Sequence, residues 1–434
     1  MLLLGIVTLS AALAQTPCGD TTAYSPCEVV FELNDAEAAE HPKPYLDVEL
    51  HAEFRSPGNR TFLMHAYWDG GRRMAIRFAP TEAGAWVYRL TSNVARFNGS
   101  VGEFTATGSN FRGFVRVENL RHFGYVVNPN RPAPHLWMGD TCYPFATIDR
   151  SLFERIVRTR ASQKFNHLRG YVMGQTPGPE PAFVDAETPN AEYFRELDSR
   201  VRFMNQHGIT ADLILGGDRN HLASVFPDWR ARQRYYRYVA ARYSAFDITW
   251  QGVQEFEEYE DGRGLLREMG QALKEFDPYN HIRSTHTIAT SSPLLPDGWM
   301  DYIAYQSSST ALGAIEHQQY ATPQVNTEFG YEDSGAGRSH DHHVDTDTFR
   351  KRLWNTTMNG QYPTYGNTGT YGGRQVEMDA RHLDAPGARQ MTVWYDFFSG
   401  TRHWELEPYF DVDGGRALAL TGVEYIVYLE KPGP

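Results

Sequence analysis

Acidic residues follow two segments with the character of buried strands, and they are the side chains best suited to chemistry. Glu255 and Glu257 share the parity of one strand face within residues 248–260, and Glu328 ends the run at 324–328. Two carboxyl groups facing each other across a cleft are what glycoside hydrolysis requires. A separation of about 5–5.5 Å suits a retaining enzyme, and about 6.5–9.5 Å suits an inverting one. Spacing along the chain does not give that distance, and Glu257 stays an alternative to Glu255 as the acid.

Other polar side chains lie at the ends of the remaining strand-like segments. Such groups bind sugar hydroxyls in many sites, but they also serve as buried hydrogen-bond partners within a fold. The candidates for substrate contact are Asp140, Arg169, Asp218, Gln254, Glu257, His286, Tyr305, Gln306 and Tyr331. Tyr331, Tyr371 and Trp394 are also considered as stacking platforms, with core packing as the favoured alternative.

These residues need a scaffold that gathers strand ends, and the chain from residue 115 to 404 has the pattern of one. Eight short apolar segments read as strands, at 135–138, 167–172, 212–215, 248–253, 282–286, 302–305, 324–327 and 363–365. Amphipathic helices are predicted at 151–163, 191–207, 228–243, 264–276, 311–320 and 346–358. Eight alternations over roughly 250 residues predict an α/β fold, a (β/α)8 barrel, and its catalytic groups are expected at the carboxyl ends of the strands.

The segments on either side of the barrel read as β structure. Short alternating runs at 27–33, 45–54, 74–78, 86–91 and 102–107 predict an antiparallel β-sandwich of immunoglobulin or fibronectin type over residues 27–110. Strands at 417–420 and 424–429 predict a short C-terminal β element over 405–434, and we leave open whether this element is truncated.

Charge and the N-terminal sequence limit the partners and the location. The chain has 41 Lys+Arg against 53 Asp+Glu, a net charge of −12, which argues against a nucleic-acid partner. Residues 1–14 form an apolar run that is too short for a transmembrane helix and ends in Ala-Leu-Ala, so a signal peptide and a secreted or periplasmic protein are expected. Cys18 and Cys27 then fit a disulfide, and Cys142 reads as a small buried hydrophobe.

Histidines and aspartates gather at residues 339–345 and raise the question of a metal. Capping and exposure explain such a loop, and the sequence holds no H-E-x-x-H motif and no paired C-x-x-C. We therefore predict no metal and no cofactor. The oligomeric state is not predicted.

Several motifs resemble those of a known family. Trp250-Gln-Gly-Val-Gln-Glu255 resembles the W-x-x-x-N-E ending of strand 4 in retaining clan A glycoside hydrolases, and Asn326-Thr-Glu328-Phe-Gly resembles their strand 7 nucleophile motif. Arg77-Phe-Ala-Pro, Gly84-Ala-Trp86 and Trp137-Met-Gly-Asp140-Thr, in this order, resemble the apiosidase-like hydrolase family. The stretch Gly422 to Tyr428 looks like the start of the collagen-binding type of β-domain that often ends its members.

The resemblance implies a role for each of the two glutamates. Glu255 would be the acid/base and Glu328 the nucleophile of a double displacement on a poly- or oligosaccharide. Gln254 occupies the place of the usual Asn, which is expected to hold the sugar 2-hydroxyl, and this departure bears on substrate type. Two alternatives stay open: a non-catalytic carbohydrate- or matrix-binding protein on a degenerate barrel, and a polysaccharide lyase using a Tyr or His base with Arg169.

Overall fold

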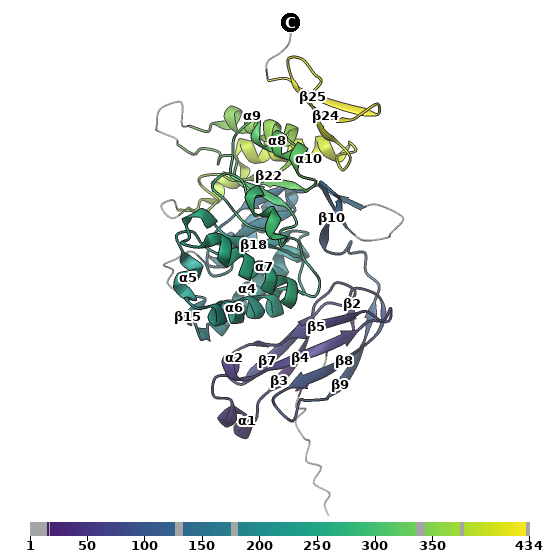
Figure 1. The fold of residues 1–434 in the computed structure, drawn as a ribbon, viewed down its shortest axis with the longest axis vertical. Coiled ribbons are helices and arrows are strands. Elements are labelled where there is room, and N and C mark those ends of the chain that lie inside the picture. Colours follow the sequence, from purple (N-terminus) through teal and green to yellow (C-terminus); the bar gives the residue numbers. More distant parts are fainter. Residues whose placement is uncertain are drawn as a thin grey trace, which may run out of the picture. The chain divides into compact units, whose positions relative to one another are not determined.

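The computed structural model describes residues 15–16, 18–125, 133–174, 181–335, 343–373 and 377–430 (Figure 1). The predicted signal peptide and most of the histidine-rich loop, residues 339–342, lie outside the described residues. The chain divides into two compact units, Met1–Ser109 and Asn110–Pro434. Each unit has its own core, and each is described by itself.

The first unit is a sandwich of two β-sheets. One sheet has the strand order β1-β3-β7-β6 and the other β2-β9-β8-β4-β5. Alternate residues of β8, such as Trp86 and Tyr88, are buried, so one face of that sheet forms the core. The strands are β1 (Gln15–Thr16), β2 (Thr21–Thr22), β3 (Cys27–Glu32), β4 (Leu50–Arg55), β5 (Thr61–His65), β6 (Tyr67–Trp68), β7 (Arg73–Phe78), β8 (Gly84–Ser92) and β9 (Val101–Thr107).

This unit contains two short helices that the sequence analysis did not predict, and one disulfide that it did. The strand predicted from residue 45 begins at Leu50, because Pro44 starts a short helix, α2 (Pro44–Asp47), at a position where its missing N–H costs nothing. A first helix, α1 (Asp35–Glu40), begins with a capping box in which Asn34 is the N-cap residue. Cys18 and Cys27 form the expected disulfide, with their Cα atoms 5.4 Å apart.

The second unit contains an eight-stranded parallel sheet with the order β19-β18-β17-β14-β13-β22-β21-β20. The first strand pairs with the eighth, and the remaining gap is bridged where the Asp301 N–H donates to the Arg283 carbonyl at 2.8 Å. The predicted (β/α)8 barrel is therefore confirmed. Its strands are β13 (Gly139–Thr141), β14 (His167–Tyr171), β17 (Thr210–Gly216), β18 (Ile248–Val253), β19 (Arg283–Ser284), β20 (Ile303–Tyr305), β21 (Gln324–Asn326) and β22 (Gln361–Tyr365).

The first barrel strand was predicted about four residues too early. Leu136, Trp137 and Met138 are buried as a strand would be, but they join no ladder and lead into β13. Just before them, β12 (Ala133–His135) pairs in an antiparallel sheet with β11 (His122–Tyr125), which in turn pairs with β10 (Val115–Asn119). An apolar run reports burial, and burial alone does not fix where pairing begins.

Helices alternate with the barrel strands (Figure 1). Five of these helices have an N-cap residue whose side chain accepts hydrogen bonds from backbone N–H groups of the first turn: Asp149, Asn190, Asp228, Asp261 and Asp345. The six predicted helices are present as α3 (Arg150–Ser162), α4 (Ala191–Gln206), α6 (Trp229–Tyr243), α7 (Gly262–Phe276), α8 (Leu312–Gln319) and α9 (Thr346–Met358). Two more, α5 (His221–Val225) and α10 (Pro386–Ser399), were not predicted, and the connection from β19 to β20 holds only the 3-10 helix η2 (Ser292–Asp297).

Three antiparallel strands follow the barrel: β23 (Glu407–Tyr409), β24 (Arg416–Leu420) and β25 (Glu424–Tyr428). Leu418 and Ile426 belong to the same core as Trp394 and Phe398 of α10. Trp394 is therefore a core residue and not a stacking platform. No helix among the described residues is long and apolar enough to cross a membrane.

Candidate active site

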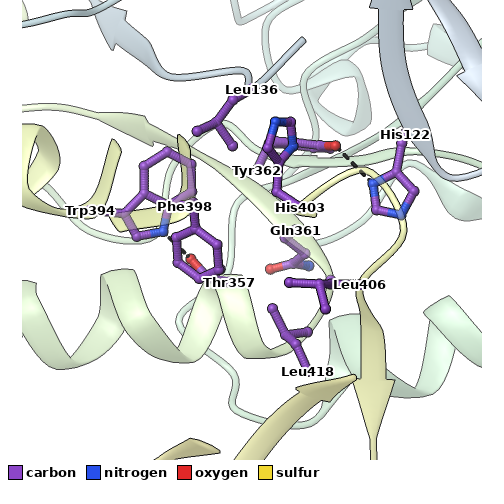
Figure 2. Close-up of a pocket in the computed structure, with 11 residues that line it drawn as sticks. His122, Leu136, Thr357, Gln361, Tyr362, Trp394, Phe398, His403, Leu406 and Leu418 are labelled. Atoms are coloured by element: carbon purple, nitrogen blue, oxygen red, sulfur yellow. Dashed lines mark hydrogen bonds between the residues drawn. The ribbon is translucent and has the colours of Figure 1, made fainter. Parts of the chain in front are cut away.

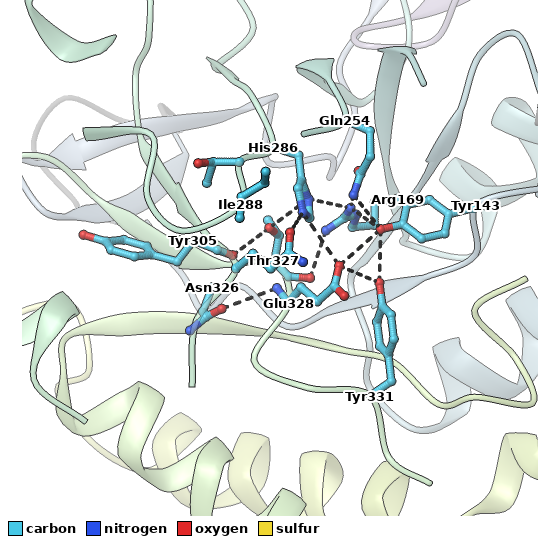
Figure 3. Close-up of polar contacts among 12 residues, drawn as sticks. Tyr143, Arg169, Gln254, His286, Ile288, Tyr305, Asn326, Thr327, Glu328 and Tyr331 are labelled. Carbon is cyan, nitrogen blue, oxygen red and sulfur yellow. Dashed lines mark hydrogen bonds and ion pairs between the residues drawn. The ribbon is translucent and has the colours of Figure 1, made fainter. Parts of the chain in front are cut away.

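Glu328 lies just past the end of β21, at the carboxyl end of the seventh barrel strand (Figure 3). Its backbone N–H donates to the Tyr305 carbonyl at 3.2 Å, and the Thr327 N–H donates to the same carbonyl at 2.9 Å, so the backbone here is anchored to β20. The Tyr331 hydroxyl donates to Glu328 Oε2 at 2.9 Å, and the Tyr143 hydroxyl lies 3.4 Å from the same oxygen. The side chain is 19% exposed, so the carboxylate is held by the protein yet open to a ligand.

Arg169, on β14, supplies a buried positive charge below Glu328. Its Nη1 donates to the Thr327 carbonyl at 2.8 Å, and its Nη2 lies 2.9 Å from the Tyr143 hydroxyl and 2.8 Å from His286 Nδ1. An arginine only donates, so His286 Nδ1 is an acceptor and the ring proton resides on Nε2. That Nε2 lies 2.7 Å from Gln306 Oε1 and 3.7 Å from Glu328 Oε2.

The pKa of Glu328 is raised from its usual value, although opposing effects act on it. Burial raises this pKa, and the nearby charge of Glu255 also raises it. Arg169 and the hydrogen bonds from Tyr331 and Tyr143 lower the pKa and favour the carboxylate. These partners offset part of the cost of burying the carboxylate, and an ionised carboxylate is what a nucleophile needs.

Glu255 follows β18 and has the left-handed backbone angle φ +47°. A non-glycine residue in this region carries strain, which is common at functional sites. Burial raises the pKa of its carboxyl, and the charges of Glu258 and Asp218 add to the rise, while a hydrogen bond from Gln306 opposes it. Oxygens of Asp218, Glu255 and Glu258 lie within 4.8 Å of one another. A carboxyl with a raised pKa in such a setting can act as a general acid.

Glu257 has a different environment from Glu255. Its carboxylate accepts from the Thr287 hydroxyl at 2.5 Å and from the Ile288 N–H at 3.1 Å. These bonds hold the loop that follows β19. The side chain is therefore engaged in positioning backbone, and the geometry favours Glu255 as the acid.

Gln254 is almost fully buried, and both ends of its amide are engaged. Its Oε1 accepts from Arg169 Nη2 at 3.0 Å, and its Nε2 donates to the Tyr143 hydroxyl at 3.0 Å. The exposed fraction of the residue is 4%. Gln254 therefore contacts the protein where the resemblance leads one to expect a contact with a sugar hydroxyl.

Two other candidates have their polar groups turned into the protein. The Asp140 carboxylate is buried and accepts from Arg160 Nε at 2.5 Å and from the Thr141 N–H at 2.8 Å. The Tyr305 hydroxyl donates to Glu316 at 2.6 Å, and its ring points away from Glu328 (Figure 3). These contacts favour structural roles for both residues.

Tyr143 is the contact that the sequence analysis missed. It lies two residues beyond β13, stacks on Tyr171 with ring centroids 4.9 Å apart, and its hydroxyl touches Arg169, Gln254 and Tyr331. Tyr331 stacks in turn on Tyr371, at 4.4 Å. An aromatic residue just past the first strand, which was predicted too early, was the available signal for Tyr143.

A second feature of this unit is a mainly apolar pocket at the other end of the eighth strand (Figure 2). It is lined at the start of β22 by Gln361 and Tyr362, whereas the glutamates lie past the carboxyl ends of their strands. Trp394, Phe398 and Leu418 form part of its wall. This pocket contains neither glutamate, so it is separate from the candidate active site.

Comparisons with known proteins bear on this site. The family described as "Apiosidase-like, catalytic domain" matches residues 124–405, and a domain of unknown function, DUF5060, matches residues 20–93. No curated protein matches the chain. The first match contains the whole barrel and both glutamates.

Solved structures share the architecture at low sequence identity. A protein of Bacteroides vulgatus ATCC 8482, described as a candidate glycoside hydrolase, has 19% identity and a TM-score of 0.76, over 93% of this chain and 84% of its own. A glycoside hydrolase of family 5 from the same organism has 15% identity and a TM-score of 0.58, over 71% and 77% of the two chains. These likenesses establish the fold.

The match to the apiosidase-like catalytic domain spans well over half of the 434 residues. The predicted family resemblance and the predicted enzyme class are therefore confirmed. The chain belongs to the apiosidase-like family of glycoside hydrolases.

Proposed function

We propose that this protein is a retaining glycoside hydrolase in which Glu328 is the nucleophile and Glu255 the acid/base. The observation that carries the proposal is the environment of Glu328. Its Oε2 accepts a hydrogen bond from the Tyr331 hydroxyl at 2.9 Å and lies 3.4 Å from the Tyr143 hydroxyl. The buried guanidinium of Arg169 contacts Tyr143 in turn. These groups favour the ionised form that attacks a sugar.

The proposed reaction uses the two carboxyl groups in turn. Glu328 attacks the anomeric carbon while the Glu255 carboxyl gives its proton to the leaving oxygen, and a glycosyl ester forms on Glu328. Glu255, now ionised, takes a proton from water, and the water oxygen displaces Glu328 from the anomeric carbon. The raised pKa of Glu255 keeps its proton available for the first step.

The substrate class we propose is a poly- or oligosaccharide, met outside the cytoplasm. The apolar run at residues 1–14 and the Cys18–Cys27 disulfide support export, because disulfides persist in oxidising compartments. Fractionation of cells that express the full chain tests the location, and retention of all of the protein in the cytoplasm would contradict export.

Replacement of each glutamate by glutamine tests the assignment. On any glycoside that the purified enzyme accepts, Glu328→Gln is expected to lower kcat by roughly 10⁴-fold or more, and Glu255→Gln by about 10²–10⁴-fold on substrates with poor leaving groups. Glu257→Gln is the matched control, since that carboxylate bonds to Thr287 and Ile288, and it is expected to keep most of the activity. Undiminished turnover by Glu328→Gln would exclude the proposed nucleophile.

The stereochemistry of the product tests the double displacement. Proton NMR during the first turnovers is expected to show the product sugar with the anomeric configuration of the substrate. An inverted product would mean that water attacks directly. An unsaturated product absorbing in the ultraviolet would instead identify a lyase.

A further inference from the structure

We propose that Tyr143, Tyr331 and Gln254 are positioning residues for Glu328. The two tyrosines direct their protons toward Oε2 of Glu328, Gln254 orients the Tyr143 hydroxyl, and Oε1 is left as the attacking atom. This inference rests on the proposed function, because it takes Glu328 as the nucleophile. The inference follows because the Arg169 guanidinium and the Gln254 NH2 group can only donate hydrogen bonds, and because the lone pairs of the Tyr143 oxygen face these two donors. Gln254 accordingly has a role in this chain other than binding a sugar hydroxyl.

The first step concerns the orientation of the Gln254 amide. Arg169 Nη2 lies 3.0 Å from one end of this amide, and a guanidinium has no acceptor. The end facing Arg169 must therefore be the oxygen, Oε1. The other end is then the NH2 group, and it donates to the Tyr143 hydroxyl at 3.0 Å.

The second step concerns the Tyr143 hydroxyl, which has two lone pairs and one proton. Neither Arg169 Nη2, at 2.9 Å, nor Gln254 Nε2, at 3.0 Å, can accept a hydrogen bond, so the Tyr143 oxygen turns its lone pairs toward both. The two N–H groups of Nη2 are shared among the Tyr143 hydroxyl, Gln254 Oε1 and His286 Nδ1. The proton of Tyr143 must then point to the remaining neighbours. These are the Tyr331 hydroxyl at 3.1 Å and Glu328 Oε2 at 3.4 Å.

The third step brings these protons to one oxygen. Tyr331 donates to Glu328 Oε2 at 2.9 Å, and when Tyr143 donates to Tyr331 it polarises that bond further. Within the part of the chain that the structure describes, the polar contacts of the Glu328 side chain, including His286 Nε2 at 3.7 Å, all fall on Oε2. Oε1 is thus the oxygen left to form the bond to the anomeric carbon.

The length of Gln254 is what allows this arrangement. Its extra methylene, relative to the Asn of the family motif, carries the amide to Tyr143 and Arg169, and both ends of the amide are used there. We expect Gln254→Asn to be a poor substitute here, because a side chain shorter by one methylene would reach at most one of these two partners.

The test is the pH profile of kcat/KM for phenylalanine variants that keep the ring packing. Tyr143→Phe and Tyr331→Phe each remove one hydroxyl from the relay to the Glu328 carboxylate, so the pKa of Glu328 rises. The acidic limb, which reports ionisation of the nucleophile in the free enzyme, is expected to move up by roughly 0.5–1 pH unit in each. Gln254→Met is expected to shift it in the same direction by less.

Other charged or titratable groups also face Glu328, and they must stay unchanged for the shift to be assigned. They come from the ends of the neighbouring barrel strands. They are Arg169, His286, Glu255 and Tyr371. Tyr365→Phe is the matched control, because its buried hydroxyl donates at 2.7 Å to a different buried carboxylate, Glu332, so the acidic limb is expected to stay in place.

The outcomes separate the two proposals. An inactive Glu328→Gln with a shifted acidic limb in Tyr143→Phe supports both. An inactive Glu328→Gln with an unshifted limb in both tyrosine variants would overturn the positioning roles and leave the nucleophile in place. An active Glu328→Gln would overturn the proposed function, whatever the limb does.

Discussion

Glu255 combines an unfavourable backbone with an unfavourable electrostatic setting. Its φ of +47° places a non-glycine residue in the left-handed region, and Glu258 and Asp218 surround its carboxyl with like charge. Neither feature helps the fold. Burial and the like charges, in that order, raise the pKa of the carboxyl, so it keeps its proton at a higher pH than usual. Burial and repulsion of this kind suit an acid catalyst near neutral pH, and backbone strain is common at functional sites.

Removal of one neighbouring charge is expected to make Glu255 a stronger acid. Glu258→Gln removes the carboxylate whose charge raises the pKa of Glu255 the most. The pKa of Glu255 therefore falls, and the alkaline limb of kcat/KM moves down by roughly 0.3–1 pH unit. Glu260→Gln, an exposed residue in the same acidic run, is the control and should leave the limb in place. An upward shift in Glu258→Gln would contradict the assigned cause.

Residue types at strand ends carried most of the information about the site. Five side chains that were named from the sequence lie around the two glutamates in the structure: Arg169, Gln254, His286, Gln306 and Tyr331. Asp140 and Tyr305 share the same kind of position, but their partners are Arg160 and Glu316. Strand parity gives the side of the barrel on which a residue starts, and it does not give the partner that its polar atoms find.

At the scale of elements, the long amphipathic helices and the buried strands were predictable because their patterns are strong. Local chemistry decided the exceptions. Pro44 turned the start of an expected strand into α2, and pairing of β13 begins only at Gly139 although burial begins earlier. The helix α10, with Pro386 in its first turn, was overlooked although its last turn, including Phe398, packs into the barrel core.

The C-terminal β element is held to the rest of its unit through Glu407 of β23. His122 Nε2 lies 3.4 Å from this carboxylate, and His317 Nε2 forms a second, close contact. Despite partial burial, the two histidines lower the pKa of Glu407 to about 2. A carboxyl with a depressed pKa stabilises the fold above the pKa it has when unfolded, and the contribution is lost as the pH falls toward 2.

Glu407→Gln is therefore expected to lower the free energy of unfolding at pH 7 by roughly 0.5–1 kcal/mol, a modest amount because the side chain is partly exposed. Chemical denaturation at pH 7 and at pH 2.5 measures the difference between variant and parent. That difference should shrink at the lower pH. Glu275→Gln, at an exposed position of α7, serves as the control and is expected to leave the free energy of unfolding nearly unchanged at both pH values. A difference for Glu407→Gln that grows with acidity would contradict the assigned role of Glu407.

At the scale of the whole molecule, buried neutral histidines make the fold sensitive to acid. Burial lowers the pKa of His135 and of His286 well below 6.5, and neighbouring positive groups contribute. The unfolded chain binds protons at these residues below about pH 6.5, whereas the folded chain does not. Stability is therefore present above that pH and declines as the pH falls.

Urea unfolding between pH 7 and pH 5 measures this effect. We expect the free energy of unfolding to fall by about 1–2 kcal/mol for each of the two histidines over this range. His135→Gln removes one of the protons taken up on unfolding, so its stability should depend less steeply on pH than that of the parent, even if the variant is less stable at pH 7. An equally steep slope would contradict the assignment to His135.

The identity of the nucleophile is the central claim, and one measurement tests it most directly. The enzyme is incubated with an activated 2-deoxy-2-fluoro glycoside of a sugar that it cleaves, and its peptides are then analysed by mass spectrometry. A glycosyl label is expected on Glu328 in the parent and in Tyr365→Phe, and none in Glu328→Gln. A label on Glu255 or on another carboxylate would contradict the assignment of Glu328 as the nucleophile.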